Sequence, residues 1–354
     1  MTLDIKDRLI EIVREAARLM EGASFEITSK EGYANIVTST DVAVQEYLCK
    51  HLKELLPGSG FLCEEDDIEE VDELTTLQGV QEYRSTGVQT LPSEATNALE
   101  PQNLKTSKPE QYTWIIDPID GTANFARGID QCAICVGLGV QEAKEFSSGV
   151  QEYRSVGVQT SPSEANTLQP HNLTTSQPHT NNSSTTSNSE FPSFGGVRGG
   201  FPATIILGIV YIPRTNELFY AERGKGAFRN GKQIHVSDRP FANGILCTAL
   251  PVYHKEYAPL CSKIILEAFT QCNDIRRFGA CAPELCYLAM GRCEMYFEYL
   301  LSPWDFAAAS LILTEAGGVI ADLNGNAPTY LHPSGIVAAN NKENLDRMLG
   351  IVNS

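Results

Sequence analysis

The chain has 354 residues, enough for one large domain or two ordinary ones, and 42% of them are hydrophobic. Its net charge of −17 argues against nucleic acid as a main partner, because such an interface needs a basic face. A small phosphorylated substrate remains compatible with this charge, since a bound divalent metal supplies local positive charge.

The N-terminal segment, residues 1–21, carries apolar residues at helical spacing with charges between them, so we predict an amphipathic helix and no signal peptide. No apolar run approaches the length that spans a membrane. We therefore expect a cytoplasmic protein with its ten cysteines reduced. Cys132 and Cys135 have CxxC spacing, but no second such pair accompanies them, and residues three apart on a strand face opposite sides. Core packing is the prediction for both.

Two segments upstream of the central motif end in carboxylates. Asp41 follows a strand-like segment, and the Thr40-Asp41 pair could cap a helix predicted over residues 42–56. Glu64 opens an acidic run after the short apolar stretch 60–63. Such a run is usually a solvated surface, but a carboxylate at Glu64 could also complete a metal site and orient a water.

The central motif follows a predicted buried strand at residues 112–116. Pro118 restricts Asp117 to extended conformations, and Asp120 follows three residues later. The two carboxylates and the Ile119 carbonyl can therefore converge as oxygen ligands, which suit Mg²⁺. Gly121 and Thr122 can open a helix whose N–H groups and dipole favour an anion. The alternative is a plain turn, because Asp, Pro and Gly are common turn residues.

A polar repeat interrupts the sequence twice. Residues 79 to about 111 recur imperfectly from 149 to about 180, and the second copy continues into Ser/Thr/Asn-rich and Gly-rich stretches. This composition cannot bury enough apolar surface to order itself. We interpret the ranges 73–111 and 147–200 as disordered inserts in surface loops, with a partner-binding module as the alternative.

A second carboxylate motif lies near the C-terminus. Asp305 follows Pro303 and Trp304 and precedes a helix predicted over residues 306–315. It is expected at the N-cap of that helix, and it could also complete a second metal site.

These segments, in this order, resemble the inositol monophosphatase family of Mg²⁺-dependent, Li⁺-sensitive phosphatases. The resemblance runs from the N-terminal helix to the C-terminus, apart from the two inserts. Its most specific motifs are Asp117-Pro-Ile-Asp120-Gly-Thr122, and Trp304-Asp305 together with Glu315-Ala-Gly-Gly318. Supporting stretches are Lys30 with residues 37–41, and residues 208–211, 217–221, 224–231 and 279–298.

The resemblance implies two metal ions. Glu64, Asp117 and the Ile119 carbonyl would bind a first Mg²⁺. Asp117, Asp120 and Asp305 would bind a second.

The resemblance also implies the catalytic and substrate-binding residues. Glu64 and Thr122 would activate a water, with Asp41 orienting the Thr122 hydroxyl. The implied substrate-binding residues are Asp120, Gly121, Thr122, Cys281, Glu298 and Asp305. The chain departs from the family at Cys63, where Gly commonly precedes the Glu pair, and at Glu284, where many members have Asp.

The fold implied by the resemblance is mixed α/β (α+β), a layered α-β-α-β-α sandwich of the sugar phosphatase type, often a homodimer. One catalytic unit would span residues 1–354, with subdomains of about 1–235 and 236–354. The expected activity is hydrolysis of a phosphate monoester on a small polyol, with inositol 1-phosphate as the leading substrate. Alternatives are fructose 1,6-bisphosphate, histidinol phosphate, 3′-phosphoadenosine 5′-phosphate, and a non-catalytic regulatory or scaffold role.

Overall fold

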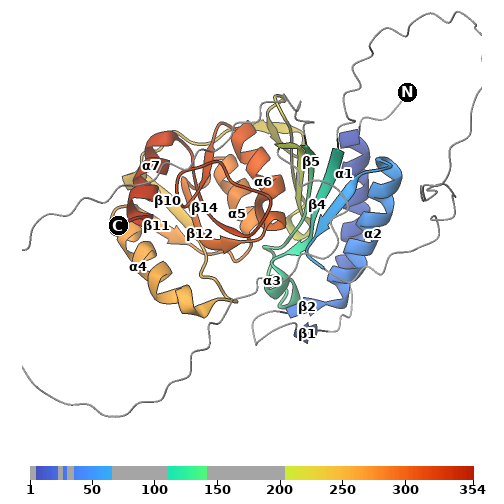
Figure 1. Ribbon diagram of the computed structural model, residues 1–354, viewed down its shortest axis with the longest axis horizontal. Coiled ribbons are helices and arrows are strands. Elements are labelled where there is room, and N and C mark those ends of the chain that lie inside the picture. Colours follow the sequence, from blue (N-terminus) through green and yellow to red (C-terminus); the bar gives the residue numbers. More distant parts are fainter. Residues whose placement is uncertain (1–4, 23–26, 30–35, 66–110, 142–203) are drawn as a thin grey trace, which may run out of the picture. The chain divides into compact units, whose positions relative to one another are not determined.

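The computed structural model describes residues 5–22, 27–29, 36–65, 111–141 and 204–354 (Figure 1). Its helices are α1 (Ile5–Ala17), α2 (Ser39–Leu55), α3 (Thr122–Ala126), α4 (Ala258–Phe269), α5 (Cys281–Ala289), α6 (Pro303–Glu315) and α7 (Lys342–Val352). Short 3₁₀ turns are η1 (Arg18–Met20), η2 (Pro213–Thr215), η3 (Phe241–Asn243) and η4 (Lys255–Tyr257).

The strands form three sheets. The seven-stranded sheet contains, in spatial order, β3 (Gly60–Cys63), β4 (Gln111–Asp120), β5 (Ala133–Gln141), β6 (Thr204–Ile212), β7 (Glu217–Glu222), β8 (Ala227–Arg229) and β9 (Lys232–Ile234). The five-stranded sheet contains, in order, β11 (Asp274–Arg276), β10 (Ile245–Thr248), β12 (Met295–Leu301), β14 (Ser334–Ala339) and β13 (Val319–Asp322). A small antiparallel pair joins β1 (Ile27–Ser29) to β2 (Ile36–Thr38).

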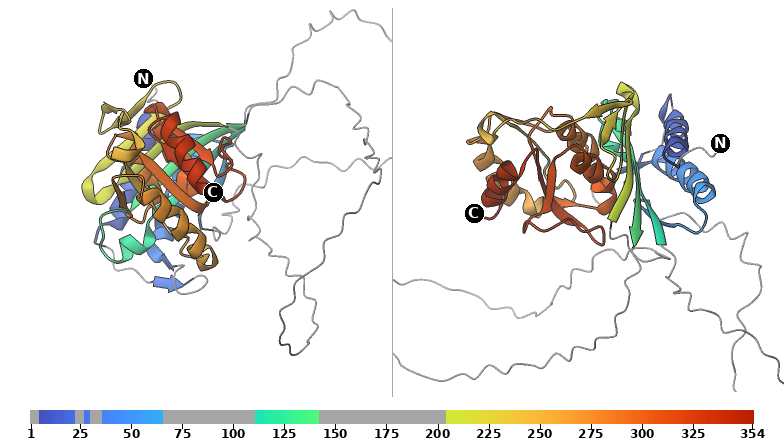
Figure 2. Two further views of the ribbon diagram at one scale, coloured as in Figure 1. Left: turned by 90° about the vertical axis from the view of Figure 1, so that its left-hand side faces the viewer. Right: turned by 90° about the horizontal axis from the view of Figure 1, so that it is seen from above.

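The elements are stacked as layers, and the predicted α-β-α-β-α sandwich is confirmed (Figures 1 and 2). Helices α1 and α2 cover one face of the seven-stranded sheet. Helices α5 and α6 fill the space between the two large sheets. Helices α4 and α7 cover the outer face of the five-stranded sheet. Three apolar clusters hold these layers together, because each sheet face and each helix stripe must be buried against another element.

Burial on both faces explains the long apolar runs of β4 and β5. Cys132 packs with the α1–α2 side of the sheet and Cys135 with the α5–α6 side, so the core-packing prediction for the CxxC pair is confirmed. All ten cysteines are free thiols.

Asp41 and Asp305 lie inside helices α2 and α6 and not at their N-caps, so the predicted caps were wrong. The N-cap of α2 is Thr38, and that of α6 is Ser302. Asp41 and Asp305 are the third helical residues and complete capping boxes with these caps. Each carboxylate is therefore fixed by the start of its own helix.

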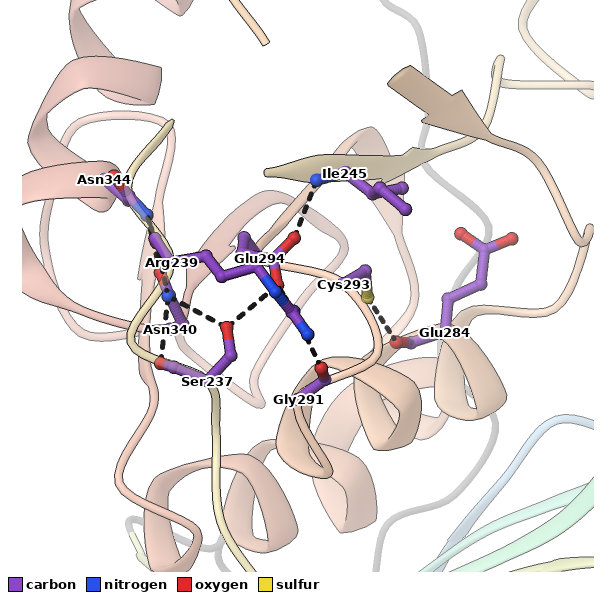
Figure 3. A network of polar contacts seen from close by, with 9 residues as sticks. All are labelled: Ser237, Arg239, Ile245, Glu284, Gly291, Cys293, Glu294, Asn340 and Asn344. Atoms are coloured by element: carbon purple, nitrogen blue, oxygen red, sulfur yellow. Dashed lines mark hydrogen bonds and ion pairs between the residues drawn. The ribbon is translucent and has the colours of Figure 1, made fainter. Parts of the chain in front are cut away.

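An ion pair between a buried glutamate and a half-exposed arginine ties the five-stranded sheet to the loops around it (Figure 3). Glu294, 1% exposed, pairs with Arg239 and accepts hydrogen bonds from the Ser237 hydroxyl at 2.8 Å and the Ile245 amide at 2.7 Å. The Asn340 side chain donates to the Ser237 and Arg239 carbonyls. These bonds satisfy the buried charge, so the network holds the entry to β10 against the end of β14.

The predicted inserts lie almost wholly outside the described residues. The range 73–111 overlaps β4 by one residue, Gln111, which was assigned to the insert wrongly because the strand starts one residue before the apolar run. The second range interrupts an antiparallel hairpin, since Val140 of β5 pairs with Thr204 of β6. Within the part of the chain that the structure describes, no helix is both long and apolar enough to cross a bilayer.

Candidate active site

The site is built at the end of β4, where the strand carries its two aspartates. The Asp-Pro-Ile-Asp segment belongs to the strand and contains a bulge between Asp117 and Asp120, so the strand is longer than the predicted 112–116 and the plain-turn alternative is wrong. A bulge re-aims side chains locally, which lets both aspartates serve one site. On the neighbouring parallel strand, the Glu64 amide donates to the Ile116 carbonyl at 3.2 Å. This bond places Glu64 beside Asp117.

Four carboxylates from three segments come together here. Burial raises the pKa of Asp117 well above its usual range, and the charges of Glu64, Asp120 and Asp305 raise it further. The pKa of Asp305 is likewise raised well above its usual range by burial, and then by Asp120 and Glu64. These mutual effects show that the four carboxylates lie near one another, although they are far apart in sequence.

Asp120 is held by the start of α5. Its Oδ1 accepts from the Cys281 amide at 3.2 Å and its Oδ2 from the Ala282 amide at 2.6 Å. Burial still raises the pKa of Asp120 to about 7 against the effect of these bonds. Cys281, predicted to face the substrate ring, lies at the first position of α5 with its residue 6% exposed.

Gly121 and Thr122 form the turn into α3. Gly121 adopts φ +87°, and a Cβ there would lie 2.9 Å from the Gln131 carbonyl oxygen, so only glycine fits. The Thr122 hydroxyl lies 3.1 Å from both Asp41 Oδ1 and the Ile119 carbonyl oxygen. The structure thus places Asp41 beside Thr122, as the resemblance implied.

Glu298 lies on β12, close to the same cluster. Its Oε2 accepts from the Tyr296 hydroxyl at 2.6 Å, and burial raises the pKa of Glu298 to about 7. Arg277 counteracts this shift and is therefore near enough to act electrostatically on Glu298.

The carboxylates fit a divalent cation in chemical character. The buried Asp117 Oδ1 has no hydrogen-bond partner among the described residues, and a metal ion would supply one. Asp305 uses its Oδ2 for the Ser302 amide at 2.7 Å, as part of its capping box. Across the described ranges, however, no group of three or more His, Cys, Asp or Glu side chains is arranged as a ready metal cage. Oxygen donors of this type suit Mg²⁺, which also takes several ligands from water and substrate.

Glu284 does not reach the candidate site through its carboxylate. It is 1% exposed, and its Oε1 accepts from the Phe278 amide at 2.7 Å and the Gly279 amide at 2.9 Å. Burial raises its pKa to about 8. This departure from the family fixes the turn before α5 and so positions the amides that bind Asp120.

Sequence reasoning missed three residues that shape the site. Gln45 is fully buried, donates to the Glu65 carbonyl at 2.7 Å and accepts from the Glu65 amide at 3.0 Å. Asn124 donates to the Gln131 and Phe278 carbonyls at 2.7 and 2.8 Å. Tyr253, after β10, is 58% exposed, and its pKa is raised by partial burial and then by the charges of Glu64 and the site's three aspartates. Only Gln45 had a signal in the sequence, because it lies one helical turn beyond Asp41.

Two further motif segments meet outside the carboxylate cluster. Glu315, at the end of α6, accepts from the Gly224 amide at 2.7 Å and the Gly226 amide at 2.8 Å. Glu315 therefore has a structural role, fixing the turn between β7 and β8 against the helix that carries Asp305.

Solved structures match this fold over nearly the whole chain. An extragenic suppressor protein SuhB from Bartonella henselae superposes with a TM-score of 0.63 at 21% identity, covering 98% of each chain. An IMPase from Thermotoga maritima superposes with a TM-score of 0.62 at 22% identity, covering 99% of this chain and 97% of its own.

Curated relatives match at higher identity. The Nus factor SuhB of Vibrio cholerae is 30% identical over 233 residues, covering 66% of this chain and 64% of its own length. A putative Nus factor SuhB of Neisseria meningitidis is 31% identical over 245 residues, covering 69% of this chain and 70% of its own.

The sequence model of the inositol monophosphatase family matches residues 2–151 and 203–354. These two ranges contain every residue of the candidate site and leave out most of the second predicted insert. The chain belongs to the inositol monophosphatase family.

Proposed function

We propose that the protein is a Mg²⁺-dependent phosphate monoester hydrolase whose leading substrate is an inositol monophosphate. The observation that supports this most strongly is the cluster of four carboxylates around Asp117, joined directly to the Gly121-Thr122 turn. A purely structural role would leave this much buried negative charge uncompensated.

The metal ligands in this proposal are Glu64, Asp117, the Ile119 carbonyl, Asp120 and Asp305. Bound Mg²⁺ would supply positive charge for the phosphate and lower the pKa of a coordinated water. Glu64 would orient that water in line with phosphorus.

Thr122 and Asp41 would act together on the attacking water. Asp41 accepts the Thr122 hydroxyl hydrogen at 3.1 Å, so the lone pairs of that hydroxyl remain available to a water. As the water attacks, its proton can pass to Thr122 while the Thr122 proton passes to Asp41. Gly121 and Thr122 would hold the phosphate at the turn into α3.

The leaving group would be a polyol recognised by hydrogen bonds. Glu298 can accept from sugar or inositol hydroxyls, and Cys281 is small enough to leave room for a ring. A bisphosphate would require a second basic pocket. Arg276 pairs with Asp274, so within the described part of the chain Arg277 is the cation that acts on Glu298, which favours a monophosphate.

A non-catalytic binding role is the second candidate, because curated relatives at about 30% identity carry the name Nus factor. A binding surface alone has no use for four carboxylates around one point, two of which, Asp117 and Asp120, are buried. The net charge of −17 also disfavours direct contact with nucleic acid.

The test is phosphate release from inositol 1-phosphate, fructose 1,6-bisphosphate, histidinol phosphate and 3′-phosphoadenosine 5′-phosphate, with and without Mg²⁺. We expect turnover of inositol 1-phosphate only with Mg²⁺, and a loss of at least about 100-fold in Asp305→Asn, on the scale of a lost electrostatic contact to the transition state. Absence of Mg²⁺-dependent turnover on all four would leave the binding role as the better account.

A further inference from the structure

Helix α2 contacts the candidate site through one stripe of side chains. Asp41, Gln45 and Cys49 are spaced by four residues and so lie along one face of the helix. Asp41 reaches the Thr122 hydroxyl, and Gln45 holds both backbone groups of Glu65. The stripe ends at Cys49, whose sulfur lies 3.7 Å from that of Cys63 at the end of β3.

The two thiols are close enough to form a covalent bond with small movements. A disulfide joins its sulfurs at about 2.05 Å, so each sulfur needs to move by less than about 1 Å. Of the ten free cysteines, only Cys49, Cys63 and Cys272 are partly exposed, and the other seven are buried. Small oxidants can therefore reach this pair, while most other thiols are shielded.

We propose that Cys49 and Cys63 form a redox-modification site in which a disulfide displaces Glu64 and weakens metal binding. In the chemical step the two thiols lose two protons and two electrons, and one S–S bond forms. Hydrogen peroxide accepts them, its O–O bond breaks, and two water molecules result. A dithiol such as dithiothreitol reverses the step by exchange.

Glu64 is sensitive to this bond because of its position in the chain. It directly follows Cys63, and its amide is bonded to the Ile116 carbonyl at 3.2 Å. Gln45 fixes the next residue, Glu65, to α2. Because Cys63 directly precedes both bonds, a pull on Cys63 toward α2 strains the hydrogen bond between Glu64 and Ile116 and shifts the Glu64 carboxylate relative to Asp117.

The disulfide itself is tested by mass spectrometry. The full-length protein is treated with hydrogen peroxide at pH 8.5, and free thiols are then blocked with iodoacetamide. We expect a cross-linked peptide pair containing Cys49 and Cys63. The cross-link should be absent in Cys49→Ser and unchanged in the matched control Cys272→Ser. Failure to form it in the wild-type protein overturns the site.

The coupling to the metal, which rests on the proposed function, is tested by thermal unfolding at increasing Mg²⁺. We expect oxidation to raise the Mg²⁺ concentration for half-maximal stabilisation at least about tenfold, the scale of a disturbed ligand support. Dithiothreitol should restore the original value, and Cys49→Ser should not respond to oxidant. Equal Mg²⁺ responses before and after oxidation overturn the coupling alone. No Mg²⁺ response in the reduced protein overturns the coupling and the proposed metal site together, while the cross-link result stands.

Discussion

At the scale of single residues, the site depends on side chains outside the carboxylate cluster that hold its backbone in place. Gln45 is the clearest case, because a fully buried amide satisfies both backbone groups of the residue after Glu64. A glutamine can donate and accept at once, which no apolar residue of that size can do.

We expect Gln45→Leu to raise the Mg²⁺ concentration for half-maximal activity about tenfold and to lower the free energy of unfolding by about 1–3 kcal/mol. The reason is that the Glu65 amide and carbonyl lose their partner while Glu64 loses its fixed position. Metal-activation curves and urea unfolding measure the two effects. Glu46→Ala, an exposed neighbour on α2, is the control and should change neither value. A variant that lost stability and kept normal Mg²⁺ activation would show that Gln45 serves the fold alone.

Glu284 gives a pH-dependent prediction. Its folded-state pKa of about 8 is above the usual value of a glutamate, so its stabilising contribution is complete at low pH. That contribution is lost as the pH rises from about 4.5 through 8, because the folded state must then bury a charge. We expect Glu284→Gln to reduce the loss in free energy of unfolding between pH 5 and 8 by at least about 1.4 kcal/mol, the equivalent of one pKa unit. Denaturant titrations at both pH values check this, with the exposed Glu54→Gln as control. Parallel stability curves for Glu284→Gln and wild type would contradict it.

At the scale of elements, helix α6, which carries Asp305, packs directly against the backbone of β6. A Cβ added at Gly208 of β6 would lie 2.5 Å from the Ala308 carbonyl oxygen. No side chain separates the helix from the sheet at this point, so the height of α6 above β6 is set by backbone contact.

We expect Gly208→Ala to lower the free energy of unfolding by about 1–3 kcal/mol, the usual cost of overpacking. It should also reduce the proposed phosphatase activity, because α6 must move outward together with Asp305. Gly137→Ala on β5 is the matched control: its Cβ would face the same helix at 3.5 Å, an ordinary contact, and should cost under about 1 kcal/mol. Equal effects from both variants would contradict the role of the Gly208 contact. Thermal unfolding and initial rates measure both.

Much of the arrangement of helices and strands could be predicted from the sequence, and the exceptions have physical causes. The strand at β4 and the helices at α1, α2 and α6 follow from apolar periodicity. The caps were misplaced because Thr38, Ser39 and Thr40 all offer a hydroxyl. In a capping box the N-cap lies three residues before the acidic residue. This spacing identifies Thr38 as the N-cap for Asp41 and Ser302 as the N-cap for Asp305. The bond between Glu315 and Gly224 could not be predicted, since it joins residues 91 apart that no local pattern relates.

At the scale of the whole molecule, the two inserts are attached in different ways. The second enters and leaves through the β5–β6 hairpin, whose last paired residues are Val140 and Thr204. The first must connect parallel strands, from the end of β3 to the start of β4. Hairpins close with a few residues, whereas parallel strands need a crossover.

We therefore expect deletion of residues 147–200 to leave the activity within about twofold of that of the full chain. The free energy of unfolding should change by no more than about 0.4 kcal/mol, since a twofold ratio corresponds to about 0.4 kcal/mol and a tenfold ratio to about 1.4 kcal/mol. Deletion of 73–110, which spares Gln111, leaves residues 66–72 to span about 16 Å along the strand direction, against a reach of about 24 Å for seven residues. That link is possible but stretched, so this variant should be the less stable of the two. Soluble yield and melting temperature rank them, and the reverse order would contradict the argument.

The position of the β5–β6 hairpin also determines where additional chain can be accommodated. Gln111 pairs with Gln141 at the start of β4, while Asp120 pairs with Ala133 at its other end. Chain added beyond Gln141 thus grows at the end of the sheet opposite to the carboxylates. Each doubling of such an addition costs only about 0.6 kcal/mol in loop closure. The fold therefore offers an insertion point for a reporter domain or a purification tag at the end of the sheet opposite to the carboxylate cluster.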